Sequence, residues 1–333
     1  MSWLNDALAD LPAGNNAAAE AVQARAADIL RPAGALARLD QVAVHMARWQ
    51  GTSHPAVHRP AGLIFAADHG VAVAGAVSAY PVDVTAAMLA AYRAGKSTVS
   101  AFASVAGATV EAIDVGVGRP TGDIRFEAAL SSERFDEAVA AGRAAVEALD
   151  ADLLVIGEMG IGNTTAAAAI AAALAALIGD TDPAAWVGRG TGVDDDGFAR
   201  KRAAVETAVA RIAGVTDPLV IAREVGGAEL VAMAAAVVAA RQRNIPVVLD
   251  GFVVTAAVAP LAAVRADALD HCLVGHCSAE PGHRRLLAAL GKQPLLDLDM
   301  RLGEGSGAMA AVPLIAMACA GVTDVPTFAE WFG

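Results

Sequence analysis

The sequence has 333 residues, enough for one large α/β domain or about two smaller ones. Hydrophobic residues make up 56% of the chain and charged residues 18%, a balance that excludes a disordered protein. The 24 Lys and Arg against 36 Asp and Glu give a net charge of −12, which opposes general attraction to nucleic acid or an anionic membrane. We therefore expect neither as a partner, and an anionic ligand must be held by local contacts.

The first residues and the cysteines predict a cytoplasmic protein. The start lacks the basic residues and apolar core of a signal peptide. The most apolar runs, 166–178 and 308–320, are predicted to be buried helices, because the first is too short to span a bilayer and a proline interrupts the second. The three cysteines form no CxxC pair and are odd in number, which fits buried thiols in a reducing compartment.

Helical spacing dominates the first part of the chain. It runs from Ala17 to Gln50 and predicts a helix that Pro32 breaks into two. The residues expected to face inward are Ile29, Leu30, Leu36, Leu39 and Val42.

From Gly62 onward, short apolar runs alternate with turns and Ala-rich helical stretches. The predicted strands are Leu63–Ala67, Thr109–Val115, Leu153–Ile156, Pro246–Leu249 and Cys272–Val274. Because parallel strands need crossovers and helices supply them, this alternation predicts an α/β fold with a mostly parallel sheet covered on both faces. No linker or internal repeat divides the chain, so we predict a large domain over 62–305 and a small helical lobe from 1–61 plus 306–333.

A buried strand followed by a glycine loop and a helix spans 152–165. A helix that starts in such a loop offers backbone N–H groups and a positive dipole end, which suit a phosphate. The residues of this candidate site are Gly160, Gly162, Asn163 and Thr164. The alternative is a tight turn in which Thr164 caps the helix. The loop matches neither a P-loop nor the dinucleotide spacing, so a mononucleotide fits better.

A second glycine turn, 188–197, precedes a helix that carries Arg200, Lys201 and Arg202. Lys201 is close enough in sequence to serve an anionic ligand, whereas Arg200 and Arg202 fit a solvated face. The alternative for the whole turn is a surface loop.

The histidines and cysteines between 271 and 283 allow a metal hypothesis, although their spacing fits no tetrahedral zinc motif well. The alternative is a ligand-facing loop with buried thiols. The last turn, 301–307, carries Glu304 among three glycines before an apolar helix. A carboxyl group in apolar surroundings gains proton affinity, so Glu304 is the candidate general base, with a helix-capping role as the alternative.

The run Gly157–Thr165 resembles a hallmark of the nicotinate-nucleotide:dimethylbenzimidazole phosphoribosyltransferase family. Further matches, in the family's order, are Ala67–Val71, Val77–Pro81, Gly188–Gly192, Val225–Gly227, Leu249–Phe252, Ser278–His283 and Leu302–Gly305. Several long motifs in one order are more specific than any single glycine pattern.

This resemblance implies a reaction that moves phosphoribose from nicotinate mononucleotide to 5,6-dimethylbenzimidazole. The products are nicotinate and α-ribazole 5′-phosphate. This reaction activates the lower ligand of cobalamin. It also implies a doubly wound sheet, a lobe built from both chain ends, and a homodimer whose partner chain contributes to each site. No metal or cofactor is needed on this account.

The resemblance assigns roles residue by residue. Glu304 matches the catalytic base, while the loop 160–164 and the turn at Gly188 match the places that hold the nucleotide phosphate and ribose. Lys201 and Ser278 match positions near the phosphoribosyl group. The matches to the benzimidazole pocket are Ser78, Tyr80 and Met88.

Two departures from the family pattern concern the acceptor base. Ala87 stands where the family commonly has Gln, and the stretch Tyr92–Thr98 replaces an Asn-Phe and glycine-rich version. We therefore expect an altered acceptor pocket at Ala87. The alternatives to the family reaction are the same transfer to another aromatic base, or a nucleotide-binding sensor without turnover.

The chemistry requires one base. Nicotinate leaves as a neutral ring, so no general acid is needed, while the attacking benzimidazole must lose a proton to Glu304. Attack from the opposite face inverts the β linkage to α. Glu158, beside the phosphate loop, is the candidate for electrostatic support of the positive charge that develops on the ribose.

Overall fold

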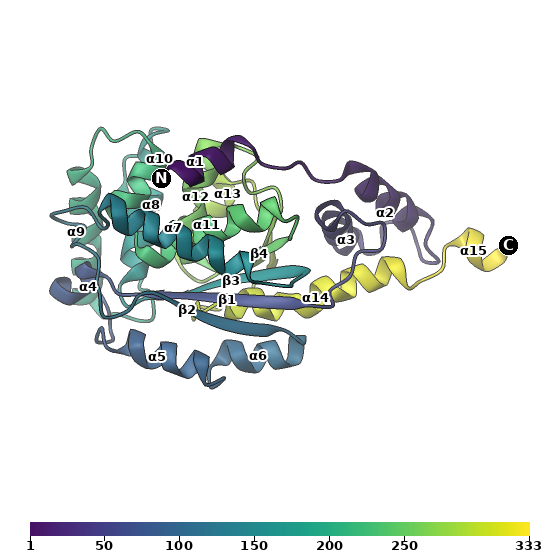
Figure 1. The fold of residues 1–333 in the computed structure, drawn as a ribbon, viewed down its shortest axis with the longest axis horizontal. Coiled ribbons are helices and arrows are strands. Elements are labelled where there is room, and N and C mark those ends of the chain that lie inside the picture. The colour runs from purple at the N-terminus through teal and green to yellow at the C-terminus, as the bar shows by residue number, and fades with distance from the viewer.

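Six parallel strands form one central sheet in the computed structural model, which describes residues 1–333 apart from the side chain of Ser2 (Figure 1). The strand order is β2-β1-β3-β4-β5-β6. The bounds are β1 Pro60–Ala67, β2 Thr109–Gly116, β3 Leu153–Met159, β4 Val247–Leu249, β5 Cys272–His276 and β6 Pro294–Leu296. The order reverses between β1 and β3, and ligands of open α/β sheets bind at the carboxyl ends of strands beside such a point. The predicted α/β class is confirmed.

Helices cover both faces of the sheet, which explains why β1 and β3 are buried along their whole length. Alternate residues of β1 enter different cores, Leu63 and Phe65 on one face and Ile64 and Ala66 on the other. On the first face the helices are α1 Ser2–Ala9, α7 Ser132–Glu147, α8 Asn163–Ala176, α9 Asp195–Arg211, α10 Pro218–Val225, α11 Ala228–Gln242, α12 Phe252–Val264 and α13 Pro281–Ala289. On the second they are α5 Val84–Arg93, α6 Thr98–Ala106 and α14 Ser306–Thr323, and the short α4 Gly70–Gly75 and the 3₁₀ turn Pro183–Trp186 complete the domain.

Helices from the N-terminal and C-terminal parts of the chain lie together beyond one end of the sheet (Figure 1). Here α2 Asn16–Asp28 and α3 Ala37–Gln50 pack with the end of α14, and α15 Phe328–Phe332 follows. Their small core consists of Val22, Ile29, Ala43, Ala47 and Val322. In contrast, α1 packs on α11. The division into two domains at the expected bounds stays a prediction.

Several local predictions can be compared with these elements. The break at Pro32 is confirmed, because α2 ends at Asp28 and α3 begins at Ala37. Leu36 does not face inward: it is 42% exposed, because it is the N-cap residue before the first turn of α3. The short strand β6 and the helix α1 were not predicted.

The apolar helix α14 is long and apolar enough to cross a membrane by length and composition alone. It packs instead against α3, α6 and β5, and it continues through Pro313. These contacts make α14 a core helix, as the sequence predicts for this run.

Candidate active site

A cavity of about 660 Å³ lies at the carboxyl ends of the strands, next to the point where the strand order reverses. Its wall comes from α5, the loop between β3 and α8, the turn before α9, the start of α12 and the turns before α13 and α14. Most of the residues proposed from the sequence line it: Ser78, Tyr80, Met88, Glu158, Gly160, Gly162, Asn163, Thr164, Lys201, Ser278 and Glu304. One cavity therefore collects residues from segments that are far apart in the chain.

The glycine loop after β3 takes a path that larger residues disfavour. Gly162 has a φ of 96°, in the left-handed region that glycine adopts without strain. A Cβ on Gly160 would lie 2.8 Å from the carbonyl oxygen of Ala67. Because of this tight path, the first turn of α8 opens directly at the cavity wall. Thr164 does not cap α8, since the N-cap is Gly162 without a side-chain bond.

Lys201 reaches this loop from α9. Its Nζ donates a hydrogen bond to Thr164 Oγ1 at 2.8 Å, and the side chain is almost fully buried. Burial lowers the pKa of Lys201 to about 8, while Glu280 acts in the opposite direction. Arg200 and Arg202 on the same helix are exposed, as the sequence predicts. A buried cation beside a helix N-terminus is suited to a phosphate.

The turn before α9 is held by Glu280, which the sequence analysis did not single out. Its Oε1 accepts a hydrogen bond from the Gly190 N–H at 2.7 Å. A Cβ on Gly188 would lie 2.0 Å from Glu280 Oε2. Gly188 is therefore covered by this carboxylate and does not line the cavity, whereas Arg189 and Gly190 do. The cavity lining therefore gives no support to a contact of Gly188 with the ligand, and that contact stays a prediction.

Ser278 is fixed by a buried histidine. The Ser278 N–H donates to His283 Nδ1 at 2.9 Å, and the other ring nitrogen lies 3.1 Å from Thr255 Oγ1. Burial lowers the pKa of His283 to about 3, so the ring is neutral with its proton on Nε2. The metal hypothesis for 271–283 gains no support, because among the described residues no three His, Cys, Asp or Glu side chains are grouped so that they could hold a metal ion. His271 Nε2, for example, contacts the carbonyl oxygen of Val237.

The turn that carries Glu304 has an unusual backbone. Gly303, Glu304 and Gly305 have φ values of 81°, 64° and 76°, and a non-glycine residue in this region costs roughly 1–2 kcal/mol. A Cβ on Gly157 of β3 would lie 2.5 Å from the nitrogen of Gly305. The turn therefore rests directly on the backbone of β3, and this contact holds the Glu304 side chain at the cavity.

Asp250, at the end of β4, secures the same turn. Its carboxylate accepts hydrogen bonds from the N–H groups of Gly305 at 3.1 Å and Ala308 at 2.8 Å. It thus supplies acceptors to the first turn of α14, whose N-cap residue makes no side-chain cap. Glu304 is free of the capping role that the sequence left open, and its carboxyl group lines the cavity.

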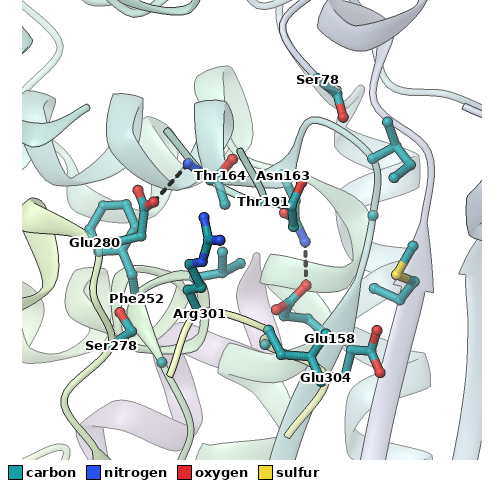
Figure 2. Close-up of a pocket in the computed structure, with 18 of the residues that line it drawn as sticks. Ser78, Glu158, Asn163, Thr164, Thr191, Phe252, Ser278, Glu280, Arg301 and Glu304 are labelled. Atoms are coloured by element: carbon teal, nitrogen blue, oxygen red, sulfur yellow. Dashed lines mark hydrogen bonds between the residues drawn. The ribbon is translucent and has the colours of Figure 1, made fainter. Parts of the chain in front are cut away.

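Two carboxyl groups with raised pKa values lie on this wall. Burial raises the pKa of Glu304, and Asp250 adds to the effect. Burial and then Asp250 raise the pKa of Glu158 to about 8, and the Asn163 amide donates a hydrogen bond to Glu158 (Figure 2). The protein environment therefore favours the protonated form of Glu158 at neutral pH.

The end of the cavity away from Lys201 and the glycine loop is largely apolar. Its wall includes Ser78, Tyr80, Val84, Met88 and Phe102. Val84 and Met88 lie one turn apart on the same face of α5, but Ala87 lies on the neighbouring, exposed face and does not line the cavity. This helix orientation gives no support to a contact of Ala87 with the acceptor base within this chain, so the role of Ala87 stays a prediction.

Other lining residues were not named from the sequence. Figure 2 shows Arg301, Thr191 and Phe252 around the cavity, with Glu280 across from Glu158 and Glu304. Arg301, Phe252 and Glu280 lie within or beside motifs that the sequence analysis quoted, so their motifs gave a signal. Only the structure shows which side chain of each motif faces the cavity.

The fold and site define an α/β nucleotide-handling enzyme, and a family model described as a phosphoribosyltransferase matches residues 11–331. A nicotinate-nucleotide–dimethylbenzimidazole phosphoribosyltransferase of Novosphingobium aromaticivorans is 50% identical over 325 residues, covering 97% of this chain and 94% of the relative. One of the same name from Methylocella silvestris is 50% identical, covering 96% and 92%. The crystal structure of CobT from Thermus thermophilus superposes with a TM-score of 0.88 at 42% identity, covering 94% of this chain and 98% of that one. The chain belongs to the nicotinate-nucleotide–dimethylbenzimidazole phosphoribosyltransferase family.

Proposed function

We propose that this enzyme transfers the phosphoribosyl group of nicotinate mononucleotide to 5,6-dimethylbenzimidazole, in the activation of the cobalamin lower ligand. The observation that carries the proposal is a carboxyl group of raised pKa, Glu304, in the same cavity as a glycine loop with a buried lysine. The names of the relatives supply the two substrates.

The donor nucleotide is assigned to the end of the cavity that carries the polar groups. The loop 160–164 and Lys201 receive the 5′-phosphate, and Ser278 and Arg301 lie at the opposite wall where the ribose passes. Lys201 gains charge when the phosphate binds, because a dianion raises the pKa of a neighbouring ammonium group.

Glu304 acts as the general base. The benzimidazole nitrogen attacks C1′ of the ribose while its other nitrogen gives its proton to Glu304. The bond between C1′ and the pyridinium nitrogen breaks, its electron pair stays on nicotinate, and the linkage inverts from β to α. No general acid is required, because the leaving ring becomes neutral.

Glu158 supports the positive charge in this scheme. The groups of the protein alone raise its pKa to about 8 and favour its protonated form. The pyridinium of the bound nucleotide is a cation, which lowers the pKa of a nearby carboxyl group and favours its ionised form. Glu158 then stabilises the oxocarbenium character of the ribose as the old bond stretches.

We also propose a cytoplasmic homodimer in which the partner chain completes the site. Tyr80 is 52% exposed and Phe102 is 38% exposed although both line the cavity. Aromatic side chains at an open mouth are typical of a surface that another chain covers. Sedimentation of the purified protein tests this assembly, and a monomer at micromolar concentration would contradict it.

The test of function is product analysis. Purified enzyme with both substrates is expected to form α-ribazole 5′-phosphate, identified by mass and by the α configuration in proton NMR. A reaction without the acceptor base is the control and should leave the nucleotide intact. Binding without turnover would show a sensor, and a higher kcat/KM with adenine or a phenol would show a different acceptor; the comparisons give no support to either alternative.

A further inference from the structure

Tyr92 is buried beside the active site without an ordinary hydrogen-bond partner. The residue is 3% exposed, and among the described residues its hydroxyl finds no partner of normal geometry. Tyr92 lies one turn after Met88 and two turns after Val84, which both line the cavity. The face of α5 that forms the cavity wall therefore carries Tyr92 inward as well.

The acidic group beside this hydroxyl is Glu304. The Tyr92 hydroxyl lowers the pKa of Glu304, in opposition to burial and Asp250. Burial, Glu304 and Glu158 raise the pKa of Tyr92 itself, so the hydroxyl keeps its proton and can only donate to a carboxylate. Contacts in an empty active site are often long and tighten when substrate binds.

The other ionisable groups that face Glu304 disfavour its charge. Asp250 comes from the end of β4, and Glu158 comes from the end of β3. Both are carboxyl groups, and a like charge at short range opposes ionisation of Glu304. The Tyr92 hydroxyl on α5 is therefore the contact that favours a Glu304 anion.

We propose that Tyr92 is a positioning residue for the base: its hydroxyl donates a hydrogen bond to the Glu304 carboxylate, stabilises the ionised form and aims the free oxygen at the acceptor nitrogen. This inference rests on the proposed function, in which Glu304 takes a proton.

The test is the pH profile of kcat/KM for dimethylbenzimidazole in the wild type and in Tyr92→Phe. The variant should move the acidic limb to higher pH by about one unit, because the carboxylate loses a donor that favours its charge. Below that limb the rate should fall about tenfold. On the alkaline plateau, where Glu304 is ionised in both proteins, the rate should fall less, because only the aim of the carboxylate is lost there. The thermal unfolding midpoint should not fall, since no other group loses a partner. An unchanged limb would overturn the proposal.

A second measurement does not depend on the variant folding. The chain contains two tyrosines, so ¹³Cζ labelling gives two resolvable NMR signals, and Tyr80 is the internal reference. The Tyr92 signal should shift as Glu304 titrates and should lose this shift in Glu304→Gln. A Tyr92 chemical shift that stays constant while Glu304 titrates would overturn the proposal.

The variant Glu304→Gln separates the two claims. If it keeps wild-type turnover, the base assignment fails and the Tyr92 inference fails with it. If Glu304→Gln loses turnover while the acidic limb of the pH profile of Tyr92→Phe stays at the pH of the wild type, only the Tyr92 inference fails. The double variant should turn over at the rate of Glu304→Gln alone, because Tyr92 acts through the carboxylate.

Discussion

The donor end and the acceptor end of the cavity are built in different ways. At the donor end, Lys201, Thr164, Glu280 and Gly190 already have hydrogen-bond partners in the protein. At the acceptor end, the wall is mostly apolar, Tyr80 is half exposed, and the Tyr92 hydroxyl has no ordinary partner among the described residues. The proposed donor end is thus organised by contacts within the protein, and we expect the bound acceptor base to complete the other end.

The ligands explain this difference. A phosphate carries charge at fixed oxygens, and charged hydrogen bonds are strong only when their donors are held in place. A flat aromatic base offers mostly apolar surface, which shape and burial can recognise. We therefore expect substitutions at the two ends to affect different kinetic constants.

The largest expected effect is at the junction of the two ends. Glu304→Gln should lower kcat by roughly 10²–10⁴-fold, the usual range for loss of a general base, while nicotinate mononucleotide still binds. Steady-state kinetics and calorimetry measure the two quantities. The control is Glu206→Gln on the exposed face of α9, which should behave as the wild type. Near-normal turnover in Glu304→Gln would show that another group takes the proton.

The next effect concerns the donor end alone. Lys201→Met should weaken nicotinate mononucleotide about 10- to 100-fold, because a buried charged donor to the phosphate is lost. The affinity for free dimethylbenzimidazole should stay within about twofold of the wild type. Arg202→Met, one residue along and exposed, is the matched control. If Lys201→Met and Arg202→Met lost the same affinity for the nucleotide, the cause would be the overall positive charge of α9 and not a direct contact. The distinction between the two ends would then fall.

The affinity for the nucleotide should depend on pH, because Lys201 lies at the donor end and loses its proton in an accessible pH range. The pKa of Lys201 is lowered to about 8, so the group is charged below this pH and loses its charge above it. The affinity for nicotinate mononucleotide should fall above pH 8, by up to about tenfold at pH 9. Calorimetry across this range checks the prediction, and Lys201→Met should remove the dependence. A flat profile in the wild type would exclude Lys201 as the phosphate ligand.

A smaller effect is expected from the loop backbone. In Gly162→Ala the left-handed φ is strained, and the new Cβ would lie 2.7 Å from the Cβ of Ala72. Nucleotide affinity should fall about five- to tenfold, because the N–H groups of the loop shift. Gly179→Ala carries a similar φ with open space around it, so it measures strain alone. If both variants bind the nucleotide normally, the loop does not hold the phosphate.

The smallest effect is expected at the acceptor end. Met88→Ala removes apolar wall and should raise KM for dimethylbenzimidazole by about three- to tenfold without changing nucleotide affinity. Ala87→Gln, on the exposed face of the same helix, should change KM less than about twofold by the same burial argument. Competition between dimethylbenzimidazole, benzimidazole and adenine completes the measurement. A larger change in Ala87→Gln than in Met88→Ala would show that the helix face is assigned incorrectly.

Features that depend on neighbours along the chain could be predicted from the sequence alone. The apolar runs of β1 and β3, flanked by Gly- and Asp-bearing turns, predicted buried parallel strands. The loop 160–164 after β3 predicted a helix N-terminus suited to phosphate. The glycines around Glu304 indicated a special turn, and the structure shows three successive left-handed residues there.

The tertiary structure decided what depends on distant segments. The three-residue strand β6 carries too short a pattern to be predicted and exists because β5 pairs with it. Glu280 covers Gly188, which no short stretch of sequence indicates, and Asp250 rather than Glu304 accepts hydrogen bonds from the start of α14. Turn chemistry and periodicity act over a few residues, so a sequence reveals them directly. The meeting of Tyr92 with Glu304 depends on the strand order and on the packing of α5 beside the sheet, which no short stretch of sequence contains.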